Sequence, residues 1–196
     1  MENKKLALAY LTMGNKYLSL AENVLQEMVN SGNPHLIVTE DEEVWGEYFE
    51  KTKWSDFNTI FPALFLFYHG VELTIKGFFP LRGIKIPPNH KDLLNTLKTT
   101  NSEELDDEIM KIIEKYFDLY QLKETPLHAW ITQNRLDIDN LYERLRYPTD
   151  KGFEDLTDDL HLKYQEEKIL PFIESMIKDS KQLRVLSVTH FRGNEE

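Results

Sequence analysis

Residues 57–79 read FNTIFPALFLFYHGVELTIKGFF. Apolar side chains fall on nearly every side of a helix built from this stretch, so it lacks the polar face that a surface helix keeps in water. Such a helix belongs at the centre of a bundle. Its few ionisable residues, His69, Glu72 and Lys76, then need partners, because an unpaired buried charge costs several kcal/mol.

The chain before this stretch predicts one long helix and a connector. Apolar residues recur every three or four positions across residues 6–28, and the sequence Asn-Ser-Gly-Asn-Pro at residues 30–34 is expected to end that helix. Residues 35–53 combine an acidic run with β-branched and aromatic residues, and we interpret them as a connector that packs locally. Ser55 or Asp56 is placed to cap the central helix.

The chain after the central helix predicts shorter helices. Asn89 is placed to cap one of them, and residues 101–104 have the spacing of a capping box for the next. A weaker helical pattern covers residues 127–145 and is stopped by Pro148, since proline disfavours helix at the residue before it.

The last predicted helix covers residues 158–183, with a kink at Pro171. The β-branched stretch at residues 186–189 is expected to be extended. Taken together, these patterns predict an all-α protein, an antiparallel helical bundle with a connector after the first helix.

Composition limits the class of protein. The chain has 196 residues, 41% of them hydrophobic and 12% aromatic, which suits one globular domain spanning residues 1–196. Cysteine is absent, and this excludes disulfides, thiolate zinc sites and cysteine nucleophiles. The 23 basic and 34 acidic residues give a net charge of −11, which disfavours non-specific binding of DNA.

The sequence does not predict association with a membrane. Its N-terminus opens into an amphipathic pattern instead of an apolar signal core, and the most apolar run, residues 60–67, is too short to cross a bilayer. We therefore expect a soluble protein of the cytoplasm.

Three polar motifs stand out against this apolar background. They are Glu-Leu-Thr-Ile-Lys at residues 72–76, His-Lys-Asp-Leu-Leu-Asn-Thr-Leu at residues 90–97, and Arg-Tyr-Pro at residues 146–148. The four-residue spacing of Glu72 and Lys76 favours an ion pair on one helix face. We expect His90 and Arg146 to converge on that pair and complete a buried polar cluster.

The order of these motifs resembles the HEPN superfamily, in members with a Glu-Leu-x-x-Lys helix, a His-x-x-Leu-x-x-Leu helix and an Arg-Tyr-Pro turn before the last helix. The resemblance covers about residues 57–185. It implies an antiparallel helical bundle, a homodimer, and a place among bacterial defence and toxin–antitoxin proteins that include RNases and non-catalytic binders. The partners that it implies are RNA, a nucleotide or another protein.

Active members of that superfamily cut RNA without a metal, with an arginine followed four to six residues later by a histidine. Arg146 matches the arginine, but residues 151–153, where the histidine is due, are Lys-Gly-Phe. The remaining candidates for proton transfer are His90 and His69, if one of them approaches Arg146 in space. Arg184 and His190 have the required spacing near the C-terminus, but we interpret this match as a coincidence.

Three functions remain open. We favour a binding or regulatory module over an enzyme, with a ligand site at Glu72, Lys76, His90, Arg146 and Tyr147, where Tyr147 is able to stack on a base. The alternatives are a metal-independent endoribonuclease that uses Arg146 and His90, and a structural dimer whose polar cluster only fixes helix register. The six histidines show no paired helical spacing, so the sequence predicts neither a metal site nor a cofactor.

Overall fold

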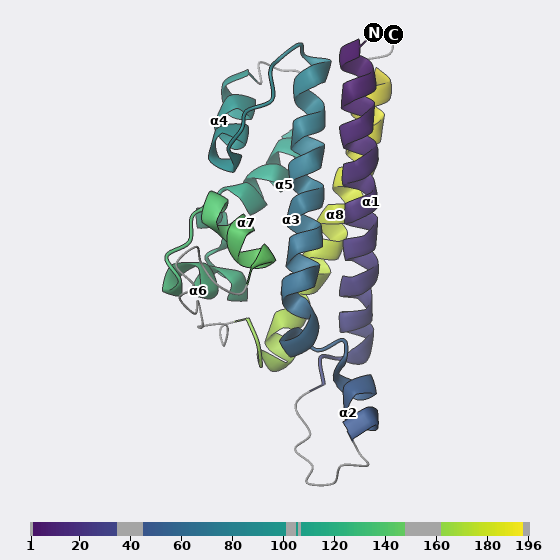
Figure 1. Cartoon of the computed structure of the whole chain (residues 1–196), viewed down its shortest axis with the longest axis vertical. Coiled ribbons are helices and arrows are strands. Elements are labelled where there is room, and N and C mark those ends of the chain that lie inside the picture. The colour runs from purple at the N-terminus through teal and green to yellow at the C-terminus, as the bar shows by residue number, and fades with distance from the viewer. Residues whose placement is uncertain (1, 35–44, 101–104, 106, 148–161, 194–196) are drawn as a thin grey trace.

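Three long helices form the body of the molecule in the computed structural model, which describes residues 2–34, 45–100, 105, 107–147 and 162–193. They are α1 (Glu2–Ser31), α3 (Asp56–Leu81) and α8 (Leu170–Gly193). Figure 1 shows α1 running antiparallel to α3 and α8, with both ends of the chain at the same end of the bundle. All regular secondary structure in the described residues is helical, which confirms the all-α prediction.

Glycines allow α1 and α3 to pack closely. A Cβ atom added at Gly70 of α3 would lie 2.9 Å from the backbone nitrogen of Leu18, and one added at Gly14 of α1 would lie 3.0 Å from that of Thr74. Real Cβ atoms do not approach backbone so closely without a shift, so any larger residue would push the helices apart. The position of the central helix therefore depends on these two glycines.

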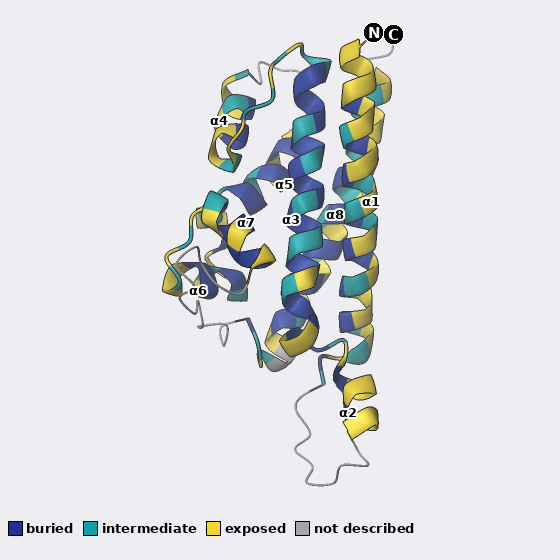
Figure 2. Ribbon diagram, viewed as in Figure 1, coloured by how far each residue is buried: buried dark blue, intermediate teal, exposed yellow. Residues whose placement is uncertain are grey.

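Shorter helices cover the side of α3 that faces away from α1 (Figure 1). In chain order they are α4 (His90–Thr100), α5 (Asp107–Phe117), the 3-10 helix η2 (Leu119–Leu122), α6 (Pro126–Gln133) and α7 (Ile138–Arg146). As a result α3 is buried along most of its length, as Figure 2 shows, which is the central position expected from its composition.

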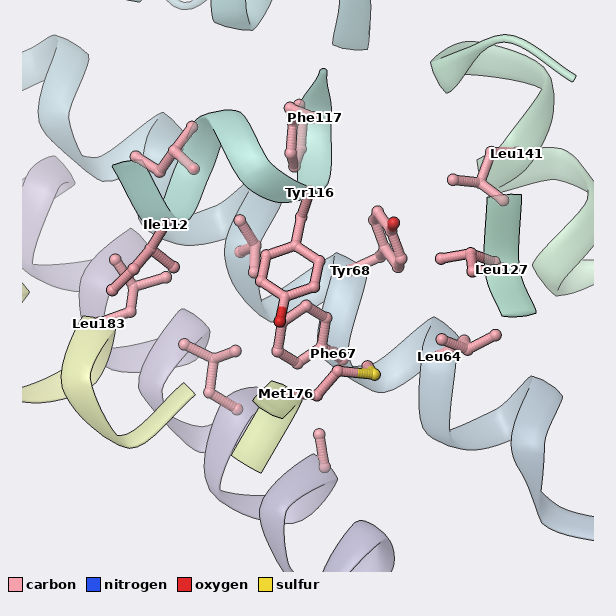
Figure 3. Close-up of a cluster of buried hydrophobic side chains, with 14 of the residues drawn as sticks. Leu64, Phe67, Tyr68, Ile112, Tyr116, Phe117, Leu127, Leu141, Met176 and Leu183 are labelled. Carbon is pink, nitrogen blue, oxygen red and sulfur yellow. The ribbon is translucent and has the colours of Figure 1, made fainter. Parts of the chain in front are cut away.

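Aromatic side chains make up much of the core. Trp130, Tyr68, Tyr116 and Phe67 are among its largest fully buried side chains, and the rings of Phe67 and Tyr116 lie 4.6 Å apart. Figure 3 shows Phe67 of α3 and Tyr116 of α5 near Met176 of α8, and Ile112 of α5 near Leu183 of α8. One cluster of buried side chains thus joins the long helices to the shorter ones.

Several predicted boundaries are wrong or fall outside the described residues. The connector contains a helix of its own, α2 (Trp45–Thr52), and residues 127–145 form two helices in place of one. The capping box predicted at residues 101–104 lies outside the described residues.

The final helix differs most from the prediction. It begins at Leu170 after the short η4 (Glu166–Ile169), so Pro171 lies in its first turn, where proline is tolerated, and does not mark a kink. Residues 186–189 are helical and not extended. Ser187 is fully buried, because the end of α8 packs along α1 and tertiary contact outweighs β propensity.

The start of α3 is fixed by Asp56, which is 2% exposed. Neither predicted cap forms: the Ser55 hydroxyl makes no capping hydrogen bond, and the Asp56 carboxylate accepts none from the amides of α3. The Asp56 carboxylate instead accepts hydrogen bonds from the side-chain amide of Asn33 at 3.1 Å and from the backbone N–H groups of Tyr164 and Gln165 at 3.1 and 2.8 Å. Asp56 thereby ties the ends of α1 and α3 to the segment before α8.

No helix in the described part of the chain is both long enough and apolar enough to span a bilayer.

Candidate functional site

The Glu72 carboxylate lies at the centre of a buried ionic cluster. Its side chain is 7% exposed, and its oxygen Oε1 accepts from Lys76 Nζ at 2.5 Å and contacts His90 Nε2 at 3.3 Å. The other oxygen, Oε2, lies 3.0 Å from His69 Nδ1. The prediction that the charges of the central helix find partners is confirmed, and both oxygens of Glu72 are occupied.

The surroundings of Glu72 keep it ionised. Burial by itself raises the pKa of a carboxyl, but hydrogen bonds from His69, His90 and Lys76, together with the charge of Lys76, outweigh it. The pKa of Glu72 is consequently held well below its ordinary value of 4.5. The carboxylate is therefore a permanent negative charge at neutral pH.

His90 connects this carboxylate to α7. Its Nδ1 lies 3.0 Å from Oδ1 of Asp139, and its backbone N–H donates to the same oxygen at 2.8 Å. The imidazole stacks on Tyr142, with ring centroids 3.8 Å apart, and the Tyr142 hydroxyl donates to the carbonyl oxygen of Tyr68 at 2.5 Å. His90 is thus held by contacts from α3 and α7 at once.

The two nitrogens of His90 face different carboxylates, one on Glu72 and one on Asp139. His90 therefore links the carboxyl group of α3 to that of α7. Sequence reasoning missed Asp139 in this role, because an aspartate in the first turn of a helix ordinarily acts within its own helix.

Arg146 does not join the cluster, so the prediction that it converges on Glu72 is wrong. Its side chain is exposed, and its guanidinium carbon lies 5.6 Å from the centre of the Tyr147 ring, which is itself 54% exposed. His69, one turn before Glu72 on the same helix, takes the place that we had expected Arg146 to fill.

The two candidate catalytic residues, His90 and Arg146, lie at different parts of α7. His90 contacts Asp139 at the start of α7, and Arg146 ends the same helix seven residues later. At 1.5 Å per residue, about 10 Å of helix separates Asp139 from Arg146. Proton transfer and charge stabilisation at one reacting group need both side chains within hydrogen-bonding distance of it.

The second arginine–histidine pair, Arg184 and His190, lies within α8 and not beyond the last helix as expected. Arg184 Nη1 donates to Glu22 on α1 at 2.7 Å, and the His190 ring packs edge-on against Phe78, with centroids 5.5 Å apart. Both side chains therefore contact the neighbouring long helices.

The described residues contain no group of three or more histidine, aspartate and glutamate side chains placed to hold a metal ion. His90 does, however, border a pocket of about 550 Å³ that lies between α4, η2 and α6. Neither Glu72 nor Lys76 lines it. Of the residues in this cluster, His90 borders the pocket.

Fold and site together define an all-α helical bundle with an ionic cluster buried between its central helix and α4. No protein-family model, curated protein or solved structure matches the chain. The resemblance to the HEPN superfamily consequently rests on the three sequence motifs.

Proposed function

We propose that the chain is a HEPN-like module of the bacterial cytoplasm that binds single-stranded RNA without cutting it. The observation that carries this proposal is the exposed pair Arg146 and Tyr147, in which the guanidinium lies over the tyrosine ring. An arginine beside an exposed aromatic ring suits RNA, because the cation contacts a phosphate while a base stacks on the ring.

The ionic cluster supports this pair indirectly. Both oxygens of Glu72 are occupied by His69, Lys76 and His90, so it offers little to a ligand. Through His90 and Asp139 the cluster fixes α7 against α3 and α4, and α7 carries Arg146 at its C-terminal end. In this proposal Glu72, Lys76 and His90 position the binding surface, and Arg146 and Tyr147 contact the ligand.

Two observations favour binding over cleavage. The first is the position of His90, which is held between two carboxylates and at a distance from Arg146. A positioned proton-transfer group contributes about 10²–10⁴-fold in rate, and His90 is not placed to supply this beside Arg146. The second is the Lys-Gly-Phe sequence at residues 151–153, where active relatives are expected to carry a histidine. We expect no degradation of single-stranded RNA in the presence of EDTA. Cleavage that survives EDTA and is lost in both Arg146→Ala and His90→Ala would establish an endoribonuclease instead.

We further propose a homodimer that forms along α1. Leu6, Met13 and Leu20 are seven residues apart, so they lie on one face of the helix, and each is about half exposed. A second copy of the chain would cover this stripe. Sedimentation at micromolar concentration should show a species of twice 23.2 kDa, and Met13→Glu should convert it to the monomer. A monomeric wild-type protein would contradict the dimer.

RNA binding is tested by fluorescence anisotropy with a labelled single-stranded oligoribonucleotide in EDTA. Tyr147→Ala should weaken binding about tenfold, because stacking of one base is worth about 1–3 kcal/mol. Arg146→Ala should weaken binding and reduce its dependence on salt, since one phosphate contact is lost.

The chain offers a matched control for this test. Tyr120 is 76% exposed and also carries a cation over its ring, with Lys123 Nζ 6.0 Å from the ring centre. Tyr120→Ala should bind RNA as the wild type does. Equal affinity of the wild type, Tyr147→Ala and Arg146→Ala would refute the proposed RNA surface.

A further inference from the structure

We propose that the pocket beside His90 is a second site, which binds a small organic anion with an apolar body and one phosphate or carboxylate head. The pocket has a volume of about 550 Å³, within the range of about 300–1,000 Å³ that is usual for small-molecule sites. Neither Arg146 nor Tyr147 lines it, so the proposal does not depend on RNA binding.

The walls of the pocket are partly apolar. Side chains from α4, from the segment around η2 and from α6 to the start of α7 contribute to them, namely Leu94, Phe117, Leu119, Ile131, Leu136 and Ile138. Such walls gain free energy by removing a hydrocarbon or aromatic body from water. The body of the ligand is therefore expected to be apolar.

Basic side chains also line the pocket. Lys91 and Lys98 come from α4 and Arg135 from the turn between α6 and α7. Within the described part of the chain, the side chains of Lys91 and Arg135 make no hydrogen bond or ion pair, whereas Lys98 lies 3.3 Å from Glu114. On a protein with a net charge of −11, two exposed cations without partners at one pocket favour an anionic ligand.

Two carboxylates also line the pocket, but each already serves the backbone. Asp118 accepts from the N–H of Tyr120 at 3.2 Å, and Asp137 accepts from the N–H of Asn140 at 2.7 Å. Both act as N-caps of the helices that follow them. Each carboxylate keeps its negative charge, so we expect an anionic head to lie beside Lys91 and Arg135 and away from Asp118 and Asp137.

The backbone at Arg135 points to a role for its side chain. Arg135 has a φ of +53°, a left-handed conformation that disfavours every side chain relative to glycine. It follows the last turn of α6, where the N–H of Arg135 donates to the carbonyl of Thr132 at 3.2 Å and that of Leu136 to Ile131 at 3.0 Å. These two hydrogen bonds form the Schellman motif that ends many helices, and glycine is the usual residue at this position of that motif. An arginine there retains a cation at the pocket in spite of the strain.

A matched pair of dyes tests the charge and the apolar body separately. 1-Anilinonaphthalene-8-sulfonate and N-phenyl-1-naphthylamine share the same rings, and only the first is anionic. We expect the anionic dye to bind the wild-type protein about tenfold more tightly, since a charge-assisted hydrogen bond is worth about 1.5–3 kcal/mol. Equal affinity for the two dyes would overturn the proposal.

Arg135→Gly is the decisive variant, because it removes the cation from a position that glycine favours. It should weaken binding of the anionic dye about tenfold, leave the neutral dye unaffected, and leave the thermal midpoint unchanged or higher. Lys181→Gln, an equal charge change on an exposed position of α8, should alter neither dye. Wild-type affinity for the anionic dye in a folded Arg135→Gly protein would refute the site.

Competition identifies the head group and separates this site from the RNA surface. 1-Naphthyl phosphate and 1-naphthoate should each displace the anionic dye, and the tighter of the two assigns a phosphate or a carboxylate head. Arg146→Ala should leave displacement unchanged. If Arg146→Ala weakens dye binding as strongly as Arg135→Gly, or if single-stranded RNA displaces the dye, the pocket is part of the RNA surface and the second site is refuted.

Discussion

Replacing Glu72 by glutamine tests the energetic role of the buried cluster. The change keeps the shape of the side chain but removes the negative charge of Glu72, which Lys76, His69 and His90 contact. Breaking a buried ion pair costs about 3–5 kcal/mol. Lys76 retains a side-chain exposure of 22%, so solvent screens part of its charge. We therefore expect Glu72→Gln to lower the free energy of unfolding at pH 7 by about 3 kcal/mol, at the lower end of that range.

The effect should depend on pH in a defined direction. Because folding depresses the pKa of Glu72 below 4.5, the ionised carboxylate stabilises the folded state fully at pH values above 4.5. This stabilisation is lost as the pH falls toward the folded pKa, by about 1.4 kcal/mol per pH unit. Glutamine does not titrate, so the gap between wild type and Glu72→Gln should narrow by about 1.4 kcal/mol at pH 3.5.

Urea unfolding followed by circular dichroism measures this gap at both pH values. Glu47 and Lys51 of α2 form a matched control, since they have the same four-residue spacing and a 2.5 Å ion pair but are more than half exposed. Glu47→Gln should leave the urea midpoint unchanged. A Glu72→Gln gap that is absent at pH 7, or equally large at pH 7 and 3.5, would refute the account of the cluster.

Three further substitutions test the fold and the surface. Gly70→Ala should destabilise the protein by about 3 kcal/mol in thermal unfolding, because its Cβ would lie 2.9 Å from the Leu18 backbone, whereas Gly46→Ala, with open space around it, should not destabilise. Asp56→Ala should lower the free energy of unfolding in urea by about 3 kcal/mol, because it leaves the donors of Asn33, Tyr164 and Gln165 without their acceptor. A urea midpoint equal to that of the wild type would contradict this role of Asp56. Arg146→Ala should keep the wild-type urea midpoint, since the side chain is exposed, and a drop of several kcal/mol would show that it is buried after all.

Part of the candidate site could be predicted from the sequence because it depends on local spacing. Glu72 and Lys76 are one helical turn apart, so any helix that contains them brings them together. His90 could be assigned to the cluster only by its motif, and its contact with Glu72 confirms that prediction. The contacts of His69 with Glu72 and of Asp139 with His90 were not predicted, because spacing alone does not tell which of several polar groups will pair with a buried carboxylate or its partners.

A helical bundle with residues 57–79 at its centre could be predicted from the sequence, because helix periodicity and an apolar surface on all sides are properties of a single segment. Which side of α7 faces the core depends on tertiary packing, and with it that Arg146 is exposed while Asp139 holds His90. Tertiary packing also decided that residues 186–189 are helical, through burial against α1. The pocket depends on side chains between residues 90 and 138, and their meeting follows from how separate helices pack, which no local pattern encodes.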